Sequence, residues 1–278
     1  MMNKKKFLIA IPTYKESENI KKLIIEINNL HPDFDILIIN DFSNDNIKET
    51  IDSLKINNIH FIERPRKLGL GTAHKLGLFY AIKNKYDFVI TMDADLSHDP
   101  KEIKSLVDKA DENSFVIGSR FCNGGKLDYS GFRRLVSIGG NLFGTKILNL
   151  EIKEITTYFR VYSVKLLKKL HYEKLNAQGY SLGVKIIWMM SKLGANLIEV
   201  PIHFRDRNKG KSKIPKFQIF VSFFDLLFIK FYENLFKLNF DNENNSYKFK
   251  NHCEKANNCF FSLKKKDYIC LVCNLKLK

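Results

Sequence analysis

Residues 88–100 read FVITMDADLSHDP, an apolar run that ends directly in a group of acidic side chains. The run 88–92 is short and rich in β-branched and aromatic residues, which is typical of a buried strand. Asp93 and Asp95 follow it. Residues two apart in an extended segment point to the same side, so we expect both carboxylates to leave the sheet together.

The same pattern of short apolar runs separated by longer amphipathic segments extends from residue 6 to about residue 120. We predict four more strands at 6–11, 36–40, 59–63 and 115–118, and helices at 17–30, 44–54, 72–84 and 100–110. Strands alternating with helices predict an α/β fold with a mostly parallel sheet flanked by helices. In such sheets ligands bind at the carboxyl ends of the strands, where the polar clusters of this chain fall.

The second half of the chain is less regular. We predict helices at 131–149, 163–170 and 180–193, a strand at 196–202, a basic loop at 204–215 and a Phe-rich helix at 216–237. After about residue 240 the composition turns to Asn, Lys and Cys. We therefore expect one α/β domain over 1–240 and a basic, Cys-containing tail over 241–278.

The composition limits the class of protein. Hydrophobic residues make up 45% of the 278 residues, which excludes a disordered or fibrous chain. The net charge of +16 is concentrated late, because Lys and Arg outnumber Asp and Glu by 16 to 7 in residues 200–278. Such an excess favours an anionic partner: a nucleic acid, an acidic membrane face or a phosphorylated substrate. Nucleic acid is the weakest of the three, since the chain has no recognisable nucleic-acid-binding module.

Asp93 and Asp95 are candidate metal ligands. Two neighbouring carboxylates repel each other unless a cation lies between them, and Mg²⁺ or Mn²⁺ bridging a diphosphate meets that need. The alternative is an acidic turn without a ligand, because this short motif also arises by chance.

Four motifs in order set a wider context: PTYKESEN at 12–19, IIND at 38–41, GLGTA at 69–73 and DADLSHDP at 93–100. Together they resemble the family 2 glycosyltransferases of GT-A fold, and within them the polyprenyl-phosphate (dolichol-phosphate) mannosyltransferases. GSRF at 118–121, FRVY at 159–162 and GKSK at 210–213 continue the resemblance, which covers about residues 6–237.

The resemblance implies roles for individual residues. The pocket for the donor's base and ribose would be formed by Pro12, Tyr14, Glu16, Ile39 and Asp41. The nucleotide diphosphate and the metal would be held by Asp93, Ala94 and Asp95, which makes the two aspartates the catalytic pair, with Ser97 as a further metal contact. The phosphates near the acceptor would meet Arg120, Arg207 and Lys213. The alternative for the basic run 205–213 is a solvated surface loop.

The implied reaction is transfer of a hexose, most simply mannose from GDP-mannose, to polyprenyl (dolichyl) phosphate. A phosphate monoester is largely dianionic at neutral pH and needs no general base, so a single in-line attack would invert the anomeric centre. Use of UDP-glucose or another nucleotide sugar is an alternative, and a non-catalytic nucleotide-sugar-binding protein is a second. Asn40, Phe42, Thr157 and Lys185 depart from the family pattern and put the substrate in doubt more than the fold.

The sequence also supports expectations about contact with a membrane and about the role of the tail. The run 7–11 after a Lys-rich start is too short for a signal peptide, and no stretch reaches the roughly 18 apolar residues of a membrane span. We expect a cytoplasmic protein bound peripherally to the cytosolic face of a membrane. The helix 216–237 would either pack on the domain or lie on the bilayer. The tail has two interpretations. Its cysteines either bind Zn²⁺, through Cys253, Cys259, Cys270 and Cys273, or are unpaired thiols.

Overall fold

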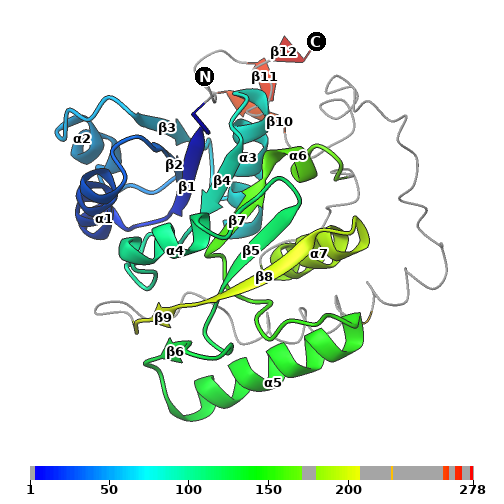
Figure 1. Cartoon of the computed structure of the whole chain (residues 1–278). Coiled ribbons are helices and arrows are strands. Elements are labelled where there is room, and N and C mark those ends of the chain that lie inside the picture. The colour runs from blue at the N-terminus through cyan, green and yellow to red at the C-terminus, as the bar shows by residue number, and fades with distance from the viewer. Residues whose placement is uncertain are drawn as a thin grey trace.

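The structure is a computed structural model that describes residues 4–170 and 180–206, Leu227, and the backbone of three short strands near the C-terminus. Its main sheet is formed by β1 (Phe7–Thr13), β2 (Asp35–Asn40), β3 (Ile59–Glu63), β4 (Phe88–Thr91), β5 (Ser114–Ser119), β7 (Arg160–Ser163) and β8 (Asn196–Pro201). The strand order is β3-β2-β1-β4-β7-β5-β8 (Figure 1). Only β7 runs antiparallel to its neighbours in this sheet.

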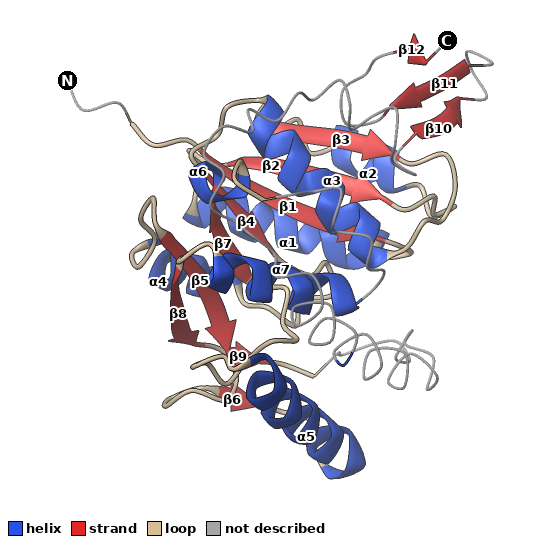
Figure 2. Cartoon of the chain, turned by 90° about the vertical axis from the view of Figure 1, so that its right-hand side faces the viewer, coloured by secondary structure: helices blue, strands red, loops and turns tan. Residues whose placement is uncertain are grey.

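Helices cover both faces of the sheet. One face carries α1 (Ser17–Leu30), α2 (Ile47–Asp52) and, after the 3-10 turn Pro100–Glu102, α4 (Ile103–Val107). The other carries α3 (Leu70–Lys83), α6 (Val164–Leu167) and α7 (Tyr180–Lys192). A longer helix, α5 (Gly131–Leu148), lies at the end of the sheet beside a small sheet of β6 (Lys126–Leu127) and β9 (His203–Phe204), as Figure 2 shows.

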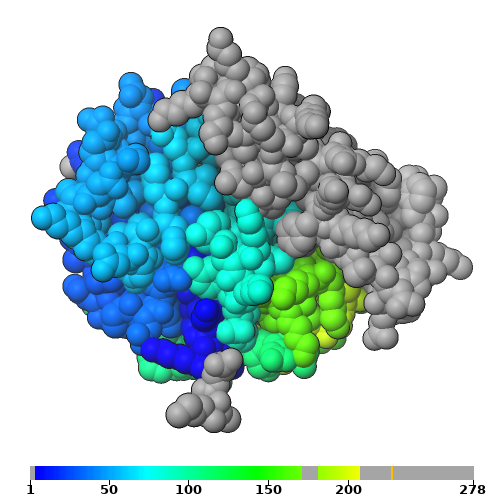
Figure 3. Space-filling model, turned by 90° about the horizontal axis from the view of Figure 1, so that it is seen from above, coloured from blue at the N-terminus to red at the C-terminus, as the bar shows by residue number. Residues whose placement is uncertain are grey.

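Two hydrophobic cores explain why the strands are almost continuously apolar. In β1, Leu8 and Ala10 belong to the core under α3, whereas Ile9 and Ile11 belong to the core under α1. A strand buried on both faces has no polar alternation. Gly77 lets α3 pack closely, because a Cβ atom there would lie 2.8 Å from the Cβ of Ala10. Seen from above, the blue and cyan first half packs directly against the green second half (Figure 3).

The predicted mostly parallel α/β sheet is confirmed, and each predicted strand corresponds to a strand of the main sheet. The sequence pattern does not predict β7, because this strand is four residues long and begins with a charged residue. Arg160 is nonetheless fully buried, and its guanidinium donates to the backbone oxygens of Ile155 (2.9 Å) and Gly183 (2.8 Å). The predicted helix 216–237 lies outside the described residues apart from Leu227.

The tail is described only by the backbone of β10 (Cys259–Ser262), β11 (Asp267–Cys270) and β12 (Lys276–Leu277), which form an antiparallel sheet. The β10–β11 register places Cys259 opposite Cys270. Cys253 and Cys273 lie outside the described residues, so the zinc site stays a prediction. In the part of the chain that the structure describes, we find no helix with the length and apolarity needed to cross a membrane.

Candidate active site

The carboxyl ends of β1, β2 and β4 meet at one edge of the sheet, and the chain bends sharply after each of them. Lys15, Phe42 and Leu96 follow these three strands with φ of 57°, 60° and 63°. Residues other than glycine rarely adopt this left-handed conformation, which costs free energy and tends to occur at functional sites. The sheet edge therefore contains local backbone strain where the sequence places its polar motifs.

The metal turn, defined here as residues 93–98, is closed by its own hydrogen bonds. The Asp93 N–H donates to Nδ1 of His98 at 3.0 Å, and the Ser97 N–H donates to Oδ1 of Asp95 at 3.1 Å. The backbone of Arg205 reaches in from beyond β9, with its N–H 3.1 Å from the Ser97 oxygen. Asp93 and Asp95 are half-buried, so the turn offers two partly solvent-accessible carboxylates from a rigid backbone.

The donor atoms of the metal turn fit Mg²⁺ or Mn²⁺. Both ions prefer oxygen ligands, and Asp93 and Asp95 supply carboxylates. The Oγ of Ser97 is buried without a hydrogen-bond partner among the described residues, as expected of a hydroxyl that awaits a ligand. The described residues contain no group of three or more His, Cys, Asp or Glu side chains able to hold a metal. Oxygen atoms of a bound diphosphate would therefore complete the coordination.

The buried side chain of His98 holds the metal turn through a hydrogen bond to its backbone. Its ring is fully buried and stacks on Phe159 with 4.8 Å between ring centroids. Burial lowers the pKa of His98 to about 4, so the ring is neutral at pH 7. Because Nδ1 accepts the Asp93 N–H, the ring proton belongs on Nε2, which lies 3.3 Å from Oγ1 of Thr157. The histidine thus links the metal turn to the loop before β7.

Asp41, predicted to contact the donor, binds its own chain. Its carboxylate accepts the backbone N–H groups of Leu68 and Gly69, each at 2.8 Å, and pairs with the buried Arg64 at 2.8 Å. Burial lowers the pKa of Arg64 to about 10, although the charge of Asp41 opposes this shift. These contacts fix the loop that leads into α3, so Asp41 shapes the edge of the predicted donor pocket.

The other predicted donor residues lie around the same edge. Pro12 and Ile39 are register partners on β1 and β2, and both are buried. Tyr14 is half-buried, and the Lys67 ammonium lies 3.8 Å above its ring centroid. Glu16 accepts a hydrogen bond from Asn19 at 2.7 Å. The strand register and the following turns bring these predicted donor residues to one edge.

One departure from the family pattern, Asn40, closes a turn through a local hydrogen bond. Asn40 is fully buried, and its side-chain oxygen accepts the Ser43 hydroxyl at 2.5 Å. This contact closes the turn in which Phe42 adopts positive φ. Lys185 lies half-buried on α7.

Arg120, predicted to meet the acceptor's phosphate, is held by a buried carboxylate. Its guanidinium binds Glu154 through two hydrogen bonds of 2.7 and 2.8 Å and donates to the Tyr129 hydroxyl at 2.7 Å. Burial opposes the charged form, but Glu154, and after it Tyr129 and Asp93, raise the pKa of Arg120 above its ordinary value. Phe204 lies between Arg120 and the metal turn, with its ring centroid 5.2 Å from the Arg120 guanidinium and 5.4 Å from the His98 ring centroid. Arg207 and Lys213 lie outside the described residues.

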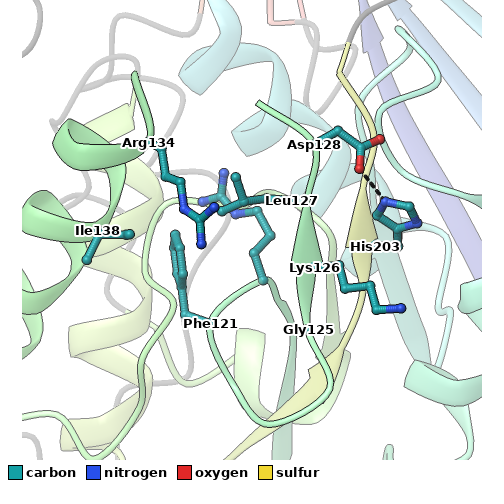
Figure 4. A pocket seen from close by; sticks show the side chains of 9 residues that line it. Phe121, Gly125, Lys126, Leu127, Asp128, Arg134, Ile138 and His203 are labelled. Atoms are coloured by element: carbon teal, nitrogen blue, oxygen red, sulfur yellow. Dashed lines mark hydrogen bonds and ion pairs between the residues drawn. The ribbon is translucent and has the colours of Figure 1, made fainter. Parts of the chain in front are cut away.

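A cavity of about 460 Å³ adjoins Arg120 between α5 and the small sheet. Lys126, Arg134 and His203 also line it, and Figure 4 shows Arg134 directed from α5 toward Phe121 and Leu127. One carboxylate of the lining, Asp128, is bound to His203 at 2.5 Å. The cavity therefore combines cationic side chains with an apolar wall, a combination suited to a phosphate on an apolar carrier.

Glu154, Arg64 and the roles of His98 and Thr157 were not predicted from the sequence. Glu154 is fully buried among the side chains that carry the site, yet its local sequence resembles a surface turn. Its partner Arg120 is 34 residues away in sequence. The local signals were the position of His98 inside the motif at 93–100 and the departure from the family pattern at Thr157, just before the motif at 159–162.

A family model and two curated relatives all compare this chain with glycosyl transferases. The family model described as Glycosyl transferase family 2 matches residues 8–171. The polyprenol monophosphomannose synthase of Mycolicibacterium smegmatis is 32% identical over 212 residues, covering 74% of this chain and 80% of that protein. The undecaprenyl-phosphate mannosyltransferase of Micrococcus luteus is 31% identical over 210 residues, covering 74% and 86%.

Solved structures share the fold. The glucosyl-3-phosphoglycerate synthase of Mycobacterium tuberculosis, in complex with phosphoglyceric acid, aligns with a TM-score of 0.61 at 16% identity, over 80% of this chain and 79% of that one. The same enzyme with Mn²⁺, UDP and phosphoglyceric acid aligns with a TM-score of 0.58 at 16% identity, over 82% and 78%. The extent of the family match and the identity to the two relatives place the chain: it belongs to glycosyl transferase family 2.

Proposed function

We propose that this protein transfers mannose from a nucleotide sugar to a polyprenyl phosphate, with inversion at the anomeric carbon. The names of the two sequence relatives support this substrate pair. The observation that carries the proposal is that an acidic site, the metal turn, lies beside a cationic cavity. The metal turn, with its two half-buried carboxylates, and Arg120 lie against the same ring, because Phe204 is 5.4 Å from the His98 ring and 5.2 Å from the Arg120 guanidinium, and Arg120 lines a cavity with further cations and an apolar wall.

The donor would occupy the sheet edge. Tyr14 and the loop held by Asp41 flank its base and ribose, and Asp93, Ala94, Asp95 and Ser97 face its diphosphate. A divalent ion bound there would neutralise the charge that develops on the leaving diphosphate. GDP-mannose is the proposed donor, with UDP-glucose as the alternative. Mn²⁺ beside UDP in the structural relative supports a metal–nucleotide site on this fold.

The acceptor phosphate would bind in the cavity. The positive charge of Arg120 is already paired with the carboxylate of Glu154. The positive charges that would balance a bound phosphate are therefore those of Lys126 and Arg134, which are both exposed. Arg207 and Lys213 are proposed to add to these charges. A dianionic phosphate held there attacks the sugar carbon, and the nucleoside diphosphate leaves from it. No general base is needed, because the attacking phosphate has already lost its protons at neutral pH.

We also propose that α5 rests on the membrane that contains the lipid acceptor. Its outward face presents apolar side chains to solvent, with Phe132 at 79%, Leu135 at 69% and Leu142 at 68% exposure. These residues recur at spacings of three and seven, on one side of a helix that projects from the body (Figure 2). Arg134 and Lys146 are exposed on the same helix and complement anionic headgroups. The lipid phosphate would then enter the adjoining cavity from the bilayer surface.

The transfer reaction is tested directly by incubating the full chain with Mn²⁺, polyprenyl phosphate and each of several labelled nucleotide sugars. Label from GDP-mannose should appear in lipid as a β-linked mannosyl phosphate. Asp95→Asn should reduce the rate by about 10²–10³, because it removes one charged group facing the leaving diphosphate. The control Asp108→Asn changes an exposed carboxylate after α4 and should keep the full rate. No transfer from any donor would refute the proposed function.

The acceptor site has its own matched pair of variants. Arg134→Ala should raise the KM for polyprenyl phosphate by about tenfold, because a hydrogen-bonded charge is lost from the cavity. Arg133→Ala is the control, since Arg133 is directed to Asp206 (2.9 Å) and does not line the cavity. Equal effects of the two variants would contradict the placement of the phosphate.

Membrane contact is tested with vesicles that contain anionic lipid. Replacing Phe132 and Leu142 by Ser should release the protein from these vesicles without changing its unfolding temperature, because neither side chain is buried. The same change at Leu30, an exposed apolar residue at the end of α1, is the control. Undiminished vesicle binding of the double variant would exclude α5 as the contact.

A further inference from the structure

The loop of residues 154–157, which we call the bracket loop, contacts three parts of the molecule at once. Through Thr157 it reaches the metal turn, through Glu154 it holds Arg120, and through Thr156 it contacts α5. These parts belong to the proposed donor site, acceptor site and membrane face. The bracket loop itself touches neither substrate in the proposed arrangement, so its contribution would be to their relative position.

The link to the metal turn passes through one hydroxyl. The Nε2–H of His98 points to Oγ1 of Thr157 at 3.3 Å, and the same oxygen accepts the Phe159 N–H at 3.1 Å. Both His98 and Thr157 are buried, so water cannot replace a lost partner. Because the other ring nitrogen of His98 holds the Asp93 N–H, the orientation of this ring sets the position of the Asp93 backbone.

The link to Arg120 passes through one carboxylate. Oε1 of Glu154 accepts the Thr156 and Thr157 N–H groups at 2.9 and 3.1 Å while it also accepts a hydrogen bond from Arg120 at 2.8 Å. The Glu154 side chain is therefore fixed by the backbone of the loop that also carries the Thr157 hydroxyl. On the outer side, Oδ1 of Asn141 on α5 accepts the Ile155 N–H at 2.7 Å.

We infer that Thr157 is a positioning residue, whose hydroxyl holds His98 and thereby sets the Asp93 backbone for metal–nucleotide binding beside Arg120. The inference rests on the proposed function only in assigning the metal turn to a metal–diphosphate. A glycine or valine at this position would leave the His98 Nε2–H buried without its hydrogen-bond acceptor, because Oδ2 of Asp93 lies 3.9 Å from Nε2, beyond hydrogen-bond distance. The turn would then lose its fixed position relative to the bracket loop while its carboxylates remained in place.

The experiment compares three variants of the full chain without any lipid acceptor. Thr157→Val keeps the shape and removes the hydroxyl, Thr157→Ser restores a hydroxyl, and Thr145→Val removes another buried threonine hydroxyl, on α5, with no contact to the turn. Free Mn²⁺ is measured by its electron paramagnetic resonance signal in the presence of GDP or UDP. All measurements are made well below the unfolding temperature of each variant.

We expect Thr157→Val to weaken Mn²⁺ binding with nucleotide by about threefold to tenfold, as one buried hydrogen bond would. Thr157→Ser should recover most of the affinity, and Thr145→Val should bind like the unchanged protein. A merely structural role would lower the unfolding temperature of both valine variants without moving the Mn²⁺ affinity. Unchanged affinity in Thr157→Val, or an equal loss in all three variants, would overturn the inference.

The outcomes separate this inference from the proposed function. If the unchanged protein binds Mn²⁺ with nucleotide but transfers no sugar to lipid, the proposed function fails and the role of Thr157 is still decided by the variants. If it binds no Mn²⁺ with either nucleotide, the inference fails, because the metal turn then has no metal–nucleotide to position.

Discussion

Two buried arginine–carboxylate pairs flank the site, and they are satisfied to different degrees. Asp41 pairs with Arg64 on the donor side, and Glu154 pairs with Arg120 on the acceptor side. Nε of Arg64 is buried without a partner among the described residues, and burial lowers the pKa of Arg64 to about 10. Arg120 instead has two bonds to Glu154 and one to Tyr129, and its pKa is raised.

The difference shows what each pair does. Burying two charges costs free energy that the pair recovers only with good geometry and additional hydrogen bonds. The Arg120 pair has these bonds and belongs to a network that reaches the metal turn. The Arg64 pair leaves Nε of the guanidinium without a partner among the described residues, although Arg64 also donates to the Gly69 oxygen and the Thr72 hydroxyl. Its carboxylate also holds the two backbone N–H groups of the loop before α3. We therefore expect the acceptor-side pair to matter more for both stability and activity.

Breaking the acceptor-side pair should have the largest effect. Glu154→Ala leaves the Arg120 charge buried without its carboxylate, which should cost about 3–5 kcal/mol of unfolding free energy. Urea unfolding of the full chain measures this loss. The double variant Arg120→Met with Glu154→Leu removes both charges and should recover part of the stability, while sugar transfer to lipid stays low. Full activity in the double variant would contradict a role for Arg120 beyond folding.

Breaking the donor-side pair should cost less. Asp41→Asn keeps one acceptor oxygen but removes the charge facing Arg64 and one acceptor for the 68–69 backbone, a loss of about 1–3 kcal/mol. Nucleotide binding, measured by calorimetry, should weaken, while the KM for polyprenyl phosphate should not change. Glu49→Gln, an exposed carboxylate on α2, serves as the control. A larger loss of stability than in Glu154→Ala would reverse the comparison.

The sequence predicted the donor side better than the acceptor side for a physical reason. Strands β1, β2 and β4 are apolar runs buried on both faces, and their ends carry polar motifs, so local pattern alone places the metal turn. On the acceptor side, burial of Glu154 depends on Arg120 and on a loop far away in sequence. Local pattern predicted that α5 is a helix, but not that Phe132 and Leu142 face solvent. Long-range pairing of charges leaves no periodic signal.

A third buried group, His74 on α3, has no compensating hydrogen-bond partner among the described residues. Its ring stacks on Tyr158 at 3.8 Å between centroids, and both ring nitrogens are buried without hydrogen bonds among the described residues. Burial, and then the charge of Arg160, hold the pKa of His74 well below its ordinary value. His74 therefore stays neutral in the folded protein at a pH where the unfolded chain already binds a proton.

The sign of the pH effect follows from this difference. Below pH of about 6.5 the unfolded state gains a proton on His74 that the folded state does not, so stability falls as the pH falls toward the folded pKa. The slope contributed by one proton is at most about 1.4 kcal/mol per pH unit. His74→Phe keeps an aromatic ring against Tyr158 and removes the titrating group, so the slope of unfolding free energy between pH 6.5 and pH 5 should decrease. An unchanged slope in this variant would show that burial of His74 does not limit stability in acid, and that the two arginine pairs and other groups account for it.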